Sequence, residues 1–125
     1  MPSKAIEEFA QLLIRHVRDE AILSADMSLD PECNSVSAKR WRQSMKRGTV
    51  SFAKEIIPDV VDDTVFALLH AIDEGLLHLS FRSEFGRLVD LSEAGESEMG
   101  GWYLGGGWRA KYSRERTNDD FADLE

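Results

Sequence analysis

The chain has 125 residues, of which 42% are hydrophobic and 30% charged, and its formal net charge is −8. This balance is typical of one globular domain with its own core and excludes a disordered chain. The negative charge disfavours general binding of DNA or RNA, because phosphates attract cations. Cys33 is the single cysteine, so no intramolecular disulfide can form, and no apolar run is long enough for a membrane span. We therefore expect a soluble, cytoplasmic domain with no nucleic-acid or membrane partner.

The segment 4–25 predicts an amphipathic helix, because its apolar residues recur at spacings of three and four. Its apolar stripe consists of Ile6, Phe9, Ala10, Leu13, Val17 and Ala21. Ser3 suits the N-cap, where its hydroxyl can accept a hydrogen bond from a backbone N–H of the first turn. The charged side chains expected to face solvent are those of Arg15, Arg18, Asp19 and Glu20.

A loop and a second helix follow. The pair Asp30-Pro31 is typical of a turn and predicts a loop over 26–34. The segment 37–47 predicts a helix that ends at Gly48. The apolar face of this helix consists of Ala38, Trp41 and Met45.

The segment 49–57, TVSFAKEII, is compatible with either a strand or a helix. Pro58 after it suits the first position of a helix, where the missing N–H is not needed. The helical spacing of apolar residues continues from there towards Gly75, which is a typical residue for ending a helix. We therefore predict a helix that begins at Pro58 and ends at Gly75.

The next part of the chain predicts a β-hairpin. Apolar and polar residues alternate weakly over 76–81, and 87–91 reads as the partner strand. The turn between them, 83–86, ends in glycine, which supplies the backbone freedom of a tight turn. Ser92 then suits the N-cap of a further short helix that leads into a glycine-rich stretch.

Together these elements predict a helix-dominated α+β fold with three to four helices and one β-hairpin. We expect residues 1–125 to form a single globular domain. The charged tail 113–125 has Phe121 and Leu124 as its only large apolar residues, and we expect it to dock through them or to fray.

Charge is distributed unevenly along the chain. Between 35 and 54 there are six cations, Lys39, Arg40, Arg42, Lys46, Arg47 and Lys54, and no acid. From 58 to 125, fifteen acidic residues stand against six basic ones, a balance of −9. The simplest interpretation of the basic run is a solvated helix face. The alternative is that Arg40-Trp41-Arg42 contacts an acidic partner or a phosphate.

The stretch 100–112, GGWYLGGGWRAKY, places five glycines among aromatic residues. It lacks the lysine and hydroxyl residue of a Walker loop, and it is not preceded by the strand that a dinucleotide fingerprint needs. Two interpretations remain. In the first, the glycines form a sharp bend that packs Trp102 and Trp108 on the core. In the second, bare backbone N–H groups form an anion-binding nest beside Arg109 and Lys111.

The histidines offer little catalytic chemistry. His70 and Glu74 lie four residues apart on a predicted helix and could reach one metal ion, but a site needs at least a third ligand. The simpler interpretation is the exposed face of an amphipathic helix. No nucleophile motif of a hydrolase is present. We predict no metal and no cofactor.

We predict that the protein works by binding, through a protein partner or as a homodimer, the commonest oligomer. Small adaptor and immunity proteins share its size and acidity. The predicted site consists of Trp102, Tyr103, Gly105, Gly106, Gly107, Trp108 and Arg109. Tryptophan, tyrosine and arginine are the residue types that contribute most energy to interfaces. The alternative is a small-anion-binding protein or an enzyme with its pocket at 100–112 and His70 or His78 for proton transfer.

Overall fold

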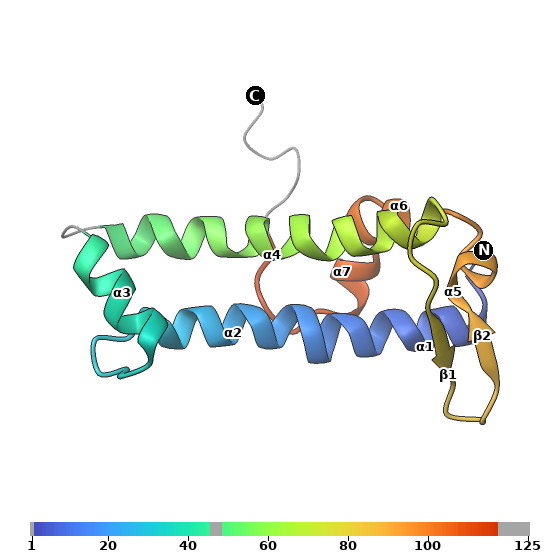
Figure 1. Cartoon of the computed structure of the whole chain (residues 1–125), viewed down its shortest axis with the longest axis horizontal. Helices are drawn as coiled ribbons and strands as arrows, with labels where there is room; N and C mark the ends of the chain where they lie inside the picture. Colours follow the sequence, from blue (N-terminus) through green and yellow to red (C-terminus); the bar gives the residue numbers. More distant parts are fainter. Residues whose placement is uncertain (1, 46–48, 118–125) are drawn as a thin grey trace.

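The computed structural model describes residues 2–45 and 49–117, and it is dominated by two long antiparallel helices (Figure 1). The first is continuous and consists of α1 (Lys4–Leu13), the π-helical segment η1 (Ile14–Arg18) and α2 (Asp19–Ser28). The second, α4 (Thr49–Asp73), is 25 residues long. Between them the chain forms α3 (Val36–Ser44), which lies beside α2 at one end of the molecule.

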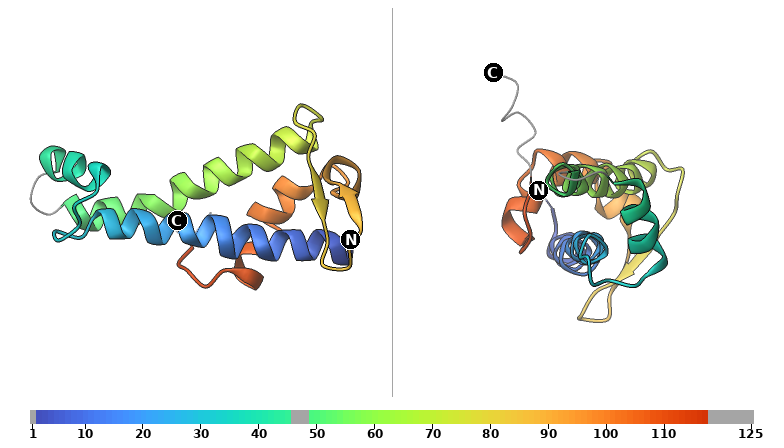
Figure 2. Two further views of the ribbon diagram at one scale, coloured as in Figure 1. Left: turned by 60° about the horizontal axis from the view of Figure 1, so that its bottom comes forward. Right: turned by 90° about the vertical axis from the view of Figure 1, so that its left-hand side faces the viewer.

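The opposite end carries the remaining elements. Strands β1 (Ser80–Arg82) and β2 (Leu88–Asp90) pair antiparallel. Three short helices then complete this end, namely α5 (Leu91–Ala94), α6 (Met99–Leu104) and α7 (Trp108–Tyr112). In Figure 2 the long helices lie close together at the α3 end and diverge towards the hairpin, and α6 lies in the wedge between them.

The predicted fold class is confirmed in its coarse form, since the structure is helix-dominated and contains one small antiparallel hairpin. The predicted number of helices is wrong. Residues 2–45 and 49–117 contain six helices when 4–28 is counted as one. The difference arises after β2, where one predicted helix is three short ones separated by the turns at Gly95 and Gly105–Gly107.

The ambiguous segment 49–57 is helical, and Pro58 lies inside α4 rather than at its start. A proline inside a helix removes the hydrogen bond to the carbonyl four residues earlier, which here belongs to Lys54. That carbonyl accepts hydrogen bonds from Nε and Nη2 of Arg116 instead, at 3.3 and 3.0 Å. Burial of Pro58 against the rest of the fold adds a favourable apolar contact. A tertiary contact therefore compensates for the missing N–H.

The ends of several elements differ from the sequence-based prediction. The first strand begins only at residue 80, because the N–H groups of Leu76 and Leu77 donate to the Ala71 carbonyl and close the end of α4. Gly75 adopts the left-handed conformation expected after a helix (φ +75°). Asp90, rather than Ser92, caps α5 by accepting from the N–H groups that follow it.

The predicted tail 113–125 is described as far as residue 117. Ser113 and Arg116 are held by hydrogen bonds to Asp19 and Asp26 of the first long helix. The predicted docking through Phe121 and Leu124, and the predicted helix end at Gly48, lie outside the described residues.

The core is unequally divided along the molecule. The larger cluster joins α1 and η1 to the C-terminal half of α4 and to α5, α6 and α7. It contains Ile14, Leu69, Met99 and Tyr103, which are all fully buried. Among the described residues, the buried cluster at the α3 end consists of Ile22, Leu29 and Ile57, with half-buried apolar residues around them. The larger share of the buried core therefore lies at the hairpin end.

Candidate functional site

The predicted site at 100–112 folds into two short helices joined by a tight turn. The N–H groups of Gly105 and Gly106 donate to the carbonyl of Gly101 at 2.9 and 3.0 Å, and Gly107 adopts φ +91° just before α7. A Cβ on Gly106 would lie 2.5 Å from Cα of Trp102, so no side chain fits there. This geometry supports the interpretation of the glycines as a bend.

The predicted site side chains lie mostly inside the protein. Tyr103, Trp108 and Arg109 are buried, and Trp102 is half-buried with its ring 5.8 Å from that of Trp108. The glycines of the turn are exposed. A partner or an anion that reached this stretch would therefore meet the glycine backbone and Trp102. Its role in binding stays a prediction.

Asp62 of α4 is the centre of a buried ion-pair network. Its carboxylate accepts hydrogen bonds from Nε of Arg18 at 2.7 Å, from Nη1 of Arg109 at 2.6 Å and from Oη of Tyr103 at 2.5 Å. Arg109 also donates to the carbonyls of Tyr103 and Leu104, which belong to the end of α6. The network therefore joins the first long helix, α4, α6 and α7.

Arg18 is fully buried, contrary to the expectation that it faces solvent. It lies on the buried stripe between Ile14 and Ile22, and its guanidinium is satisfied by protein acceptors alone. Besides Asp62, Arg18 donates to Asp19, to the hydroxyl of Ser113 and to the carbonyl of Arg116, each at 2.9 Å. Asp19 is buried for the same reason, so its predicted exposure is also wrong.

The partners of this network set the pKa values of its members. Burial alone would raise the pKa of Asp62, but the hydrogen bonds from Arg18 and Tyr103 outweigh burial and hold that pKa below its usual value. Burial, then the hydrogen bond to Asp62, raises the pKa of Tyr103 far above that of a free phenol. Burial would lower the pKa of Arg18, but Asp62 raises it further, so both guanidinium and carboxylate stay charged.

The charged groups of this network form their hydrogen bonds with other groups of the same chain. In the part of the chain that the structure describes, every buried side-chain nitrogen and oxygen has a hydrogen-bond partner. Asp62 is only 4% exposed, so substrate has no direct access to it. We interpret the network as the connection that fixes the short C-terminal helices to the long pair, and not as catalytic machinery.

His70 and His78, which were considered for metal binding or proton transfer, are exposed. His70 stacks on Phe66 and its Nε2 lies 3.5 Å from the carboxylate of Glu74. His78 lies in the exposed turn before β1. Among residues 2–45 and 49–117, no group of three or more His, Cys, Asp or Glu side chains could hold a metal ion. Asp73 has a structural role, because it accepts from the N–H groups of Met99 and Gly100 at the start of α6.

An apolar groove of about 370 Å³ lies at the α3 end, between α2, α3 and the N-terminal half of α4. It is lined by Ala25 of α2 and Leu29 just after it, by Trp41 of α3 and Met45 just after it, and by five residues of α4 between Ala53 and Val61. Its lining is apolar almost throughout. By contrast, hollows elsewhere on the described surface are lined partly by charged side chains such as Lys4, Glu8 and Glu84.

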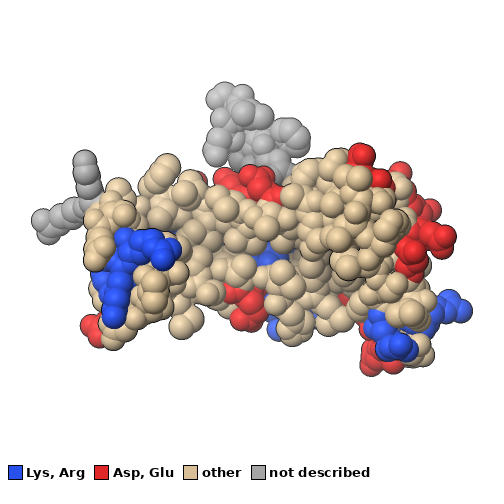
Figure 3. Space-filling model, viewed as in Figure 1, with Lys and Arg blue, Asp and Glu red and all other residues tan. Residues whose placement is uncertain are grey.

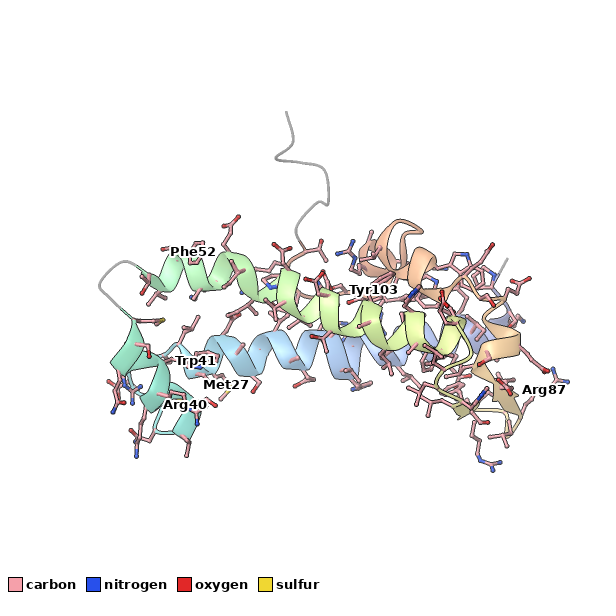
Figure 4. The ribbon with its side chains drawn as sticks, turned by 45° about the horizontal axis from the view of Figure 1, so that its top comes forward. Met27, Arg40, Trp41, Phe52, Arg87 and Tyr103 are labelled. Atoms are coloured by element: carbon pink, nitrogen blue, oxygen red, sulfur yellow. The ribbon has the colours of Figure 1, made fainter. Side chains whose placement is uncertain are left out.

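Other apolar side chains at this end of the molecule are also exposed. Val60, which lines the groove, is 58% exposed, and Met27 of α2 and Phe52 of α4 are 67% and 66% exposed. Figure 4 shows Met27, Trp41 and Phe52 at the same end of the molecule. We call the groove with Val60 on its edge the α3-end groove.

A basic strip lies beside the α3-end groove. Lys39, Arg40 and Arg42 are all exposed on α3, the same helix that contributes Trp41 to the groove. Figure 3 shows this cluster of blue side chains over α3, next to a broad uncharged surface. Of the predicted apolar face, Trp41 and Met45 line the groove and Ala38 is fully buried, so the sequence indicated which side of α3 faces inwards.

Comparisons of the chain with family models, with curated proteins and with solved structures find no match. Within the described ranges, each helix is too short or too polar to cross a lipid bilayer.

The sequence analysis missed two features that the structure makes prominent. The first is the Asp62 network, although a signal exists: Arg18 stands four residues from both Ile14 and Ile22, and Asp62 shares its helix face with Val65 and Leu69. The second is the α3-end groove. No local pattern shows it, because it forms only when 25–29, 41–45 and 53–61 come together.

Proposed function

We propose that this protein is a small binding domain of the adaptor or immunity type, and that it recognises another protein through the α3-end groove. The proposal keeps the binding function expected from the sequence. It moves the contact surface from the glycine stretch to the other half of the molecule.

The observation that supports it is a groove lined almost entirely by apolar side chains, which leaves Val60 and parts of Trp41 open to water. Apolar side chains such as Leu76 and Phe85 are also exposed at the hairpin end, but the hollows there are lined partly by charged side chains. Covering apolar surface yields about 25 cal/mol per Å². Apolar hollows rimmed by polar residues are typical of binding sites.

The rest of the fold suits such a role. The Asp62 network fixes the two long helices to each other at mid-length. It therefore helps to position the helices that form the groove and does not cover the groove itself. A pre-formed groove costs a partner less conformational entropy than one that must be assembled.

The test is a selection of binders followed by matched variants. Helical peptides are selected from a displayed random library against the full chain, and their dissociation constants are measured by fluorescence anisotropy. Val60→Lys places a charge on the edge of the groove at an exposed helix position. Leu76→Lys makes the same kind of change at the hairpin end, where Leu76 is 79% exposed.

We expect binders whose affinity falls at least about tenfold in Val60→Lys and is unchanged in Leu76→Lys, since a charge in an apolar contact must be desolvated. Binders that ignore Val60→Lys would overturn the proposal, as would a selection that yields none. Thermal unfolding of both variants checks that they fold like the parent.

A further inference from the structure

We infer that the partner presents an acidic amphipathic helix, which lays its apolar side in the α3-end groove and its acidic flank along α3. This inference rests on the proposed function and names the chemistry of the partner.

A helical occupant follows from the lining of the groove. The lining comes from side chains of three helices, and it offers almost no polar atoms. An extended peptide would bring unpaired N–H and C=O groups into this apolar surface, at a large cost. The strand edges of the described chain are in the hairpin at the opposite end (Figure 1), so an extended peptide finds no strand to join there. A helix satisfies its own backbone and presents only side chains.

The groove also sets the length of the contact. Its lining residues on α4 run from Ala53 to Val61, which is two turns or about 12 Å of helix. A partner helix of two to three turns would fill it with apolar residues spaced i, i+3 or i+4, and i+7. Trp41 lies in the groove and would contact these residues directly.

The acidic character follows from α3. This helix carries Lys39, Arg40 and Arg42 on its exposed surface and has no acidic residue. Glu55 and Asp59 of α4 are exposed, and helical periodicity places them on the face of α4 opposite its lining residues, so the attraction is directed to the α3 flank of the partner. Complementary charges beside an apolar contact accelerate association and select partners.

A second copy of the chain fits this charge pattern less well. A two-fold interface brings the same patch of both copies together, and this patch, the groove with α3, carries cations but no acidic side chain. A second copy therefore offers the cations of α3 no opposite charge, whereas an acidic helix does. We therefore assign the groove to a different protein.

The test compares two peptides with the same apolar face, one with glutamate and one with lysine at its other positions. Arg40→Glu reverses a charge on α3, and Arg87→Glu is the matched control at the hairpin end; Figure 4 labels both positions. Both arginines are exposed. Affinities for the full-length chain are measured at low and at high salt, and the same variants are examined by analytical ultracentrifugation.

We expect the glutamate peptide to bind at least about tenfold more tightly than the lysine peptide at low salt, with a smaller preference at high salt. Arg40→Glu should reduce this preference and Arg87→Glu should leave it unchanged. Equal affinity of both peptides, with sensitivity to Val60→Lys retained, would overturn the acidic partner and leave the proposed function intact. Binding insensitive to Val60→Lys would overturn both.

Two further outcomes count against a separate partner. Self-association of the parent that Val60→Lys abolishes would assign the groove to a second copy. The segment 118–125, NDDFADLE, is itself acidic and contains Phe121 and Leu124. If a chain ending at residue 117 bound the glutamate peptide and the full chain did not, this segment would be the occupant.

Discussion

Asp62 is a single carboxylate that receives hydrogen bonds from three side chains of three other elements. Replacing a buried ion pair by apolar residues can be neutral, but removing one member leaves the others charged and unpaired. In this network, loss of Asp62 leaves the guanidinium of Arg109 without the carboxylate that now lies 2.6 Å away. We therefore expect the loss of this one carboxylate to lower the free energy of unfolding strongly.

We expect Asp62→Asn to lower the free energy of unfolding by about 3–5 kcal/mol, because Arg18 and Arg109 both lose their buried ion pair with Asp62. Asp63→Asn is the matched control, since Asp63 is the exposed neighbour on the same helix. Its effect should stay within about 0.5 kcal/mol. Urea denaturation followed by circular dichroism measures both, and similar losses for the two variants would contradict the account.

The lowered pKa of Asp62 also predicts how stability depends on pH. Because the folded-state pKa lies below the unfolded value of about 3.9, the stabilisation is complete above that value and is lost as the pH falls through the folded pKa. Asp26, whose pKa is lowered mainly by its hydrogen bond from Arg116, acts in the same direction. We expect the parent to lose more stability below about pH 4 than Asp62→Asn does. If the free energy of unfolding fell equally with pH in the parent and in Asp62→Asn, Asp62 would not contribute to the pH dependence of stability.

Arg18 shows which part of a side chain's surroundings can be predicted from the sequence and which part cannot. The helix spacing around Arg18 placed it next to two buried isoleucines, but its charge suggested a solvent-facing residue. Whether an arginine can be buried depends on a carboxylate 44 positions away in the chain, and no local pattern carries that information.

At the scale of elements, α4 shows how a tertiary contact can override a local rule. Pro58 predicts a helix start, yet α4 begins at Thr49. Because Pro58 has no N–H, the carbonyl of Lys54 accepts a hydrogen bond from Arg116 instead. The guanidinium of Arg116 also pairs with Asp26 at 2.7 and 2.9 Å. The proline and the arginine should therefore be coupled.

A double-mutant cycle tests this coupling. In Pro58→Ala the new N–H can donate to the Lys54 carbonyl, so the hydrogen bonds from Arg116 become less important. We expect Arg116→Met to destabilise the Pro58→Ala protein less than the parent, with a coupling of about 0.5–3 kcal/mol. Free energies of unfolding of the parent, both single variants and the double variant give the value. Strict additivity would show that Arg116 does not replace the missing bond.

The glycine bend supports a second prediction at this scale. In Gly106→Ala the new Cβ would meet the backbone of Trp102 at 2.5 Å, which the turn cannot relieve by moving one side chain. We expect a loss of about 1–3 kcal/mol, typical of overpacking. Gly101→Ala is the control, since open space surrounds that position inside α6 and alanine favours helix by roughly 0.5–1 kcal/mol. Thermal unfolding should therefore shift in opposite directions, and a harmless Gly106→Ala would contradict the geometry.

For the molecule as a whole, the sequence predicted a helical domain with one hairpin but could not predict its uneven core. The main helices were visible from apolar spacing in 4–25 and 58–75, and the turn from its glycines. The position of the larger buried cluster depends on where α6 and α7 pack. They pack against the C-terminal half of α4 and against α1 and η1, which leaves the other end open.

Two aromatic residues of the predicted site, Tyr103 and Trp108, are buried, which their residue types alone did not show. Tryptophan and tyrosine are common both in cores and in interfaces, and composition alone does not separate the two. Tyr103 and Trp108 are in the core, whereas Trp41 lines the groove.

Backbone amide NMR during titration with the glutamate-faced helical peptide would locate the binding surface residue by residue. We expect the shifted amides to cluster in three segments, 25–29, 36–44 and 53–61, which form the α3-end groove. Shifts confined to 100–112 would contradict this expectation and would return the binding site to the glycine stretch.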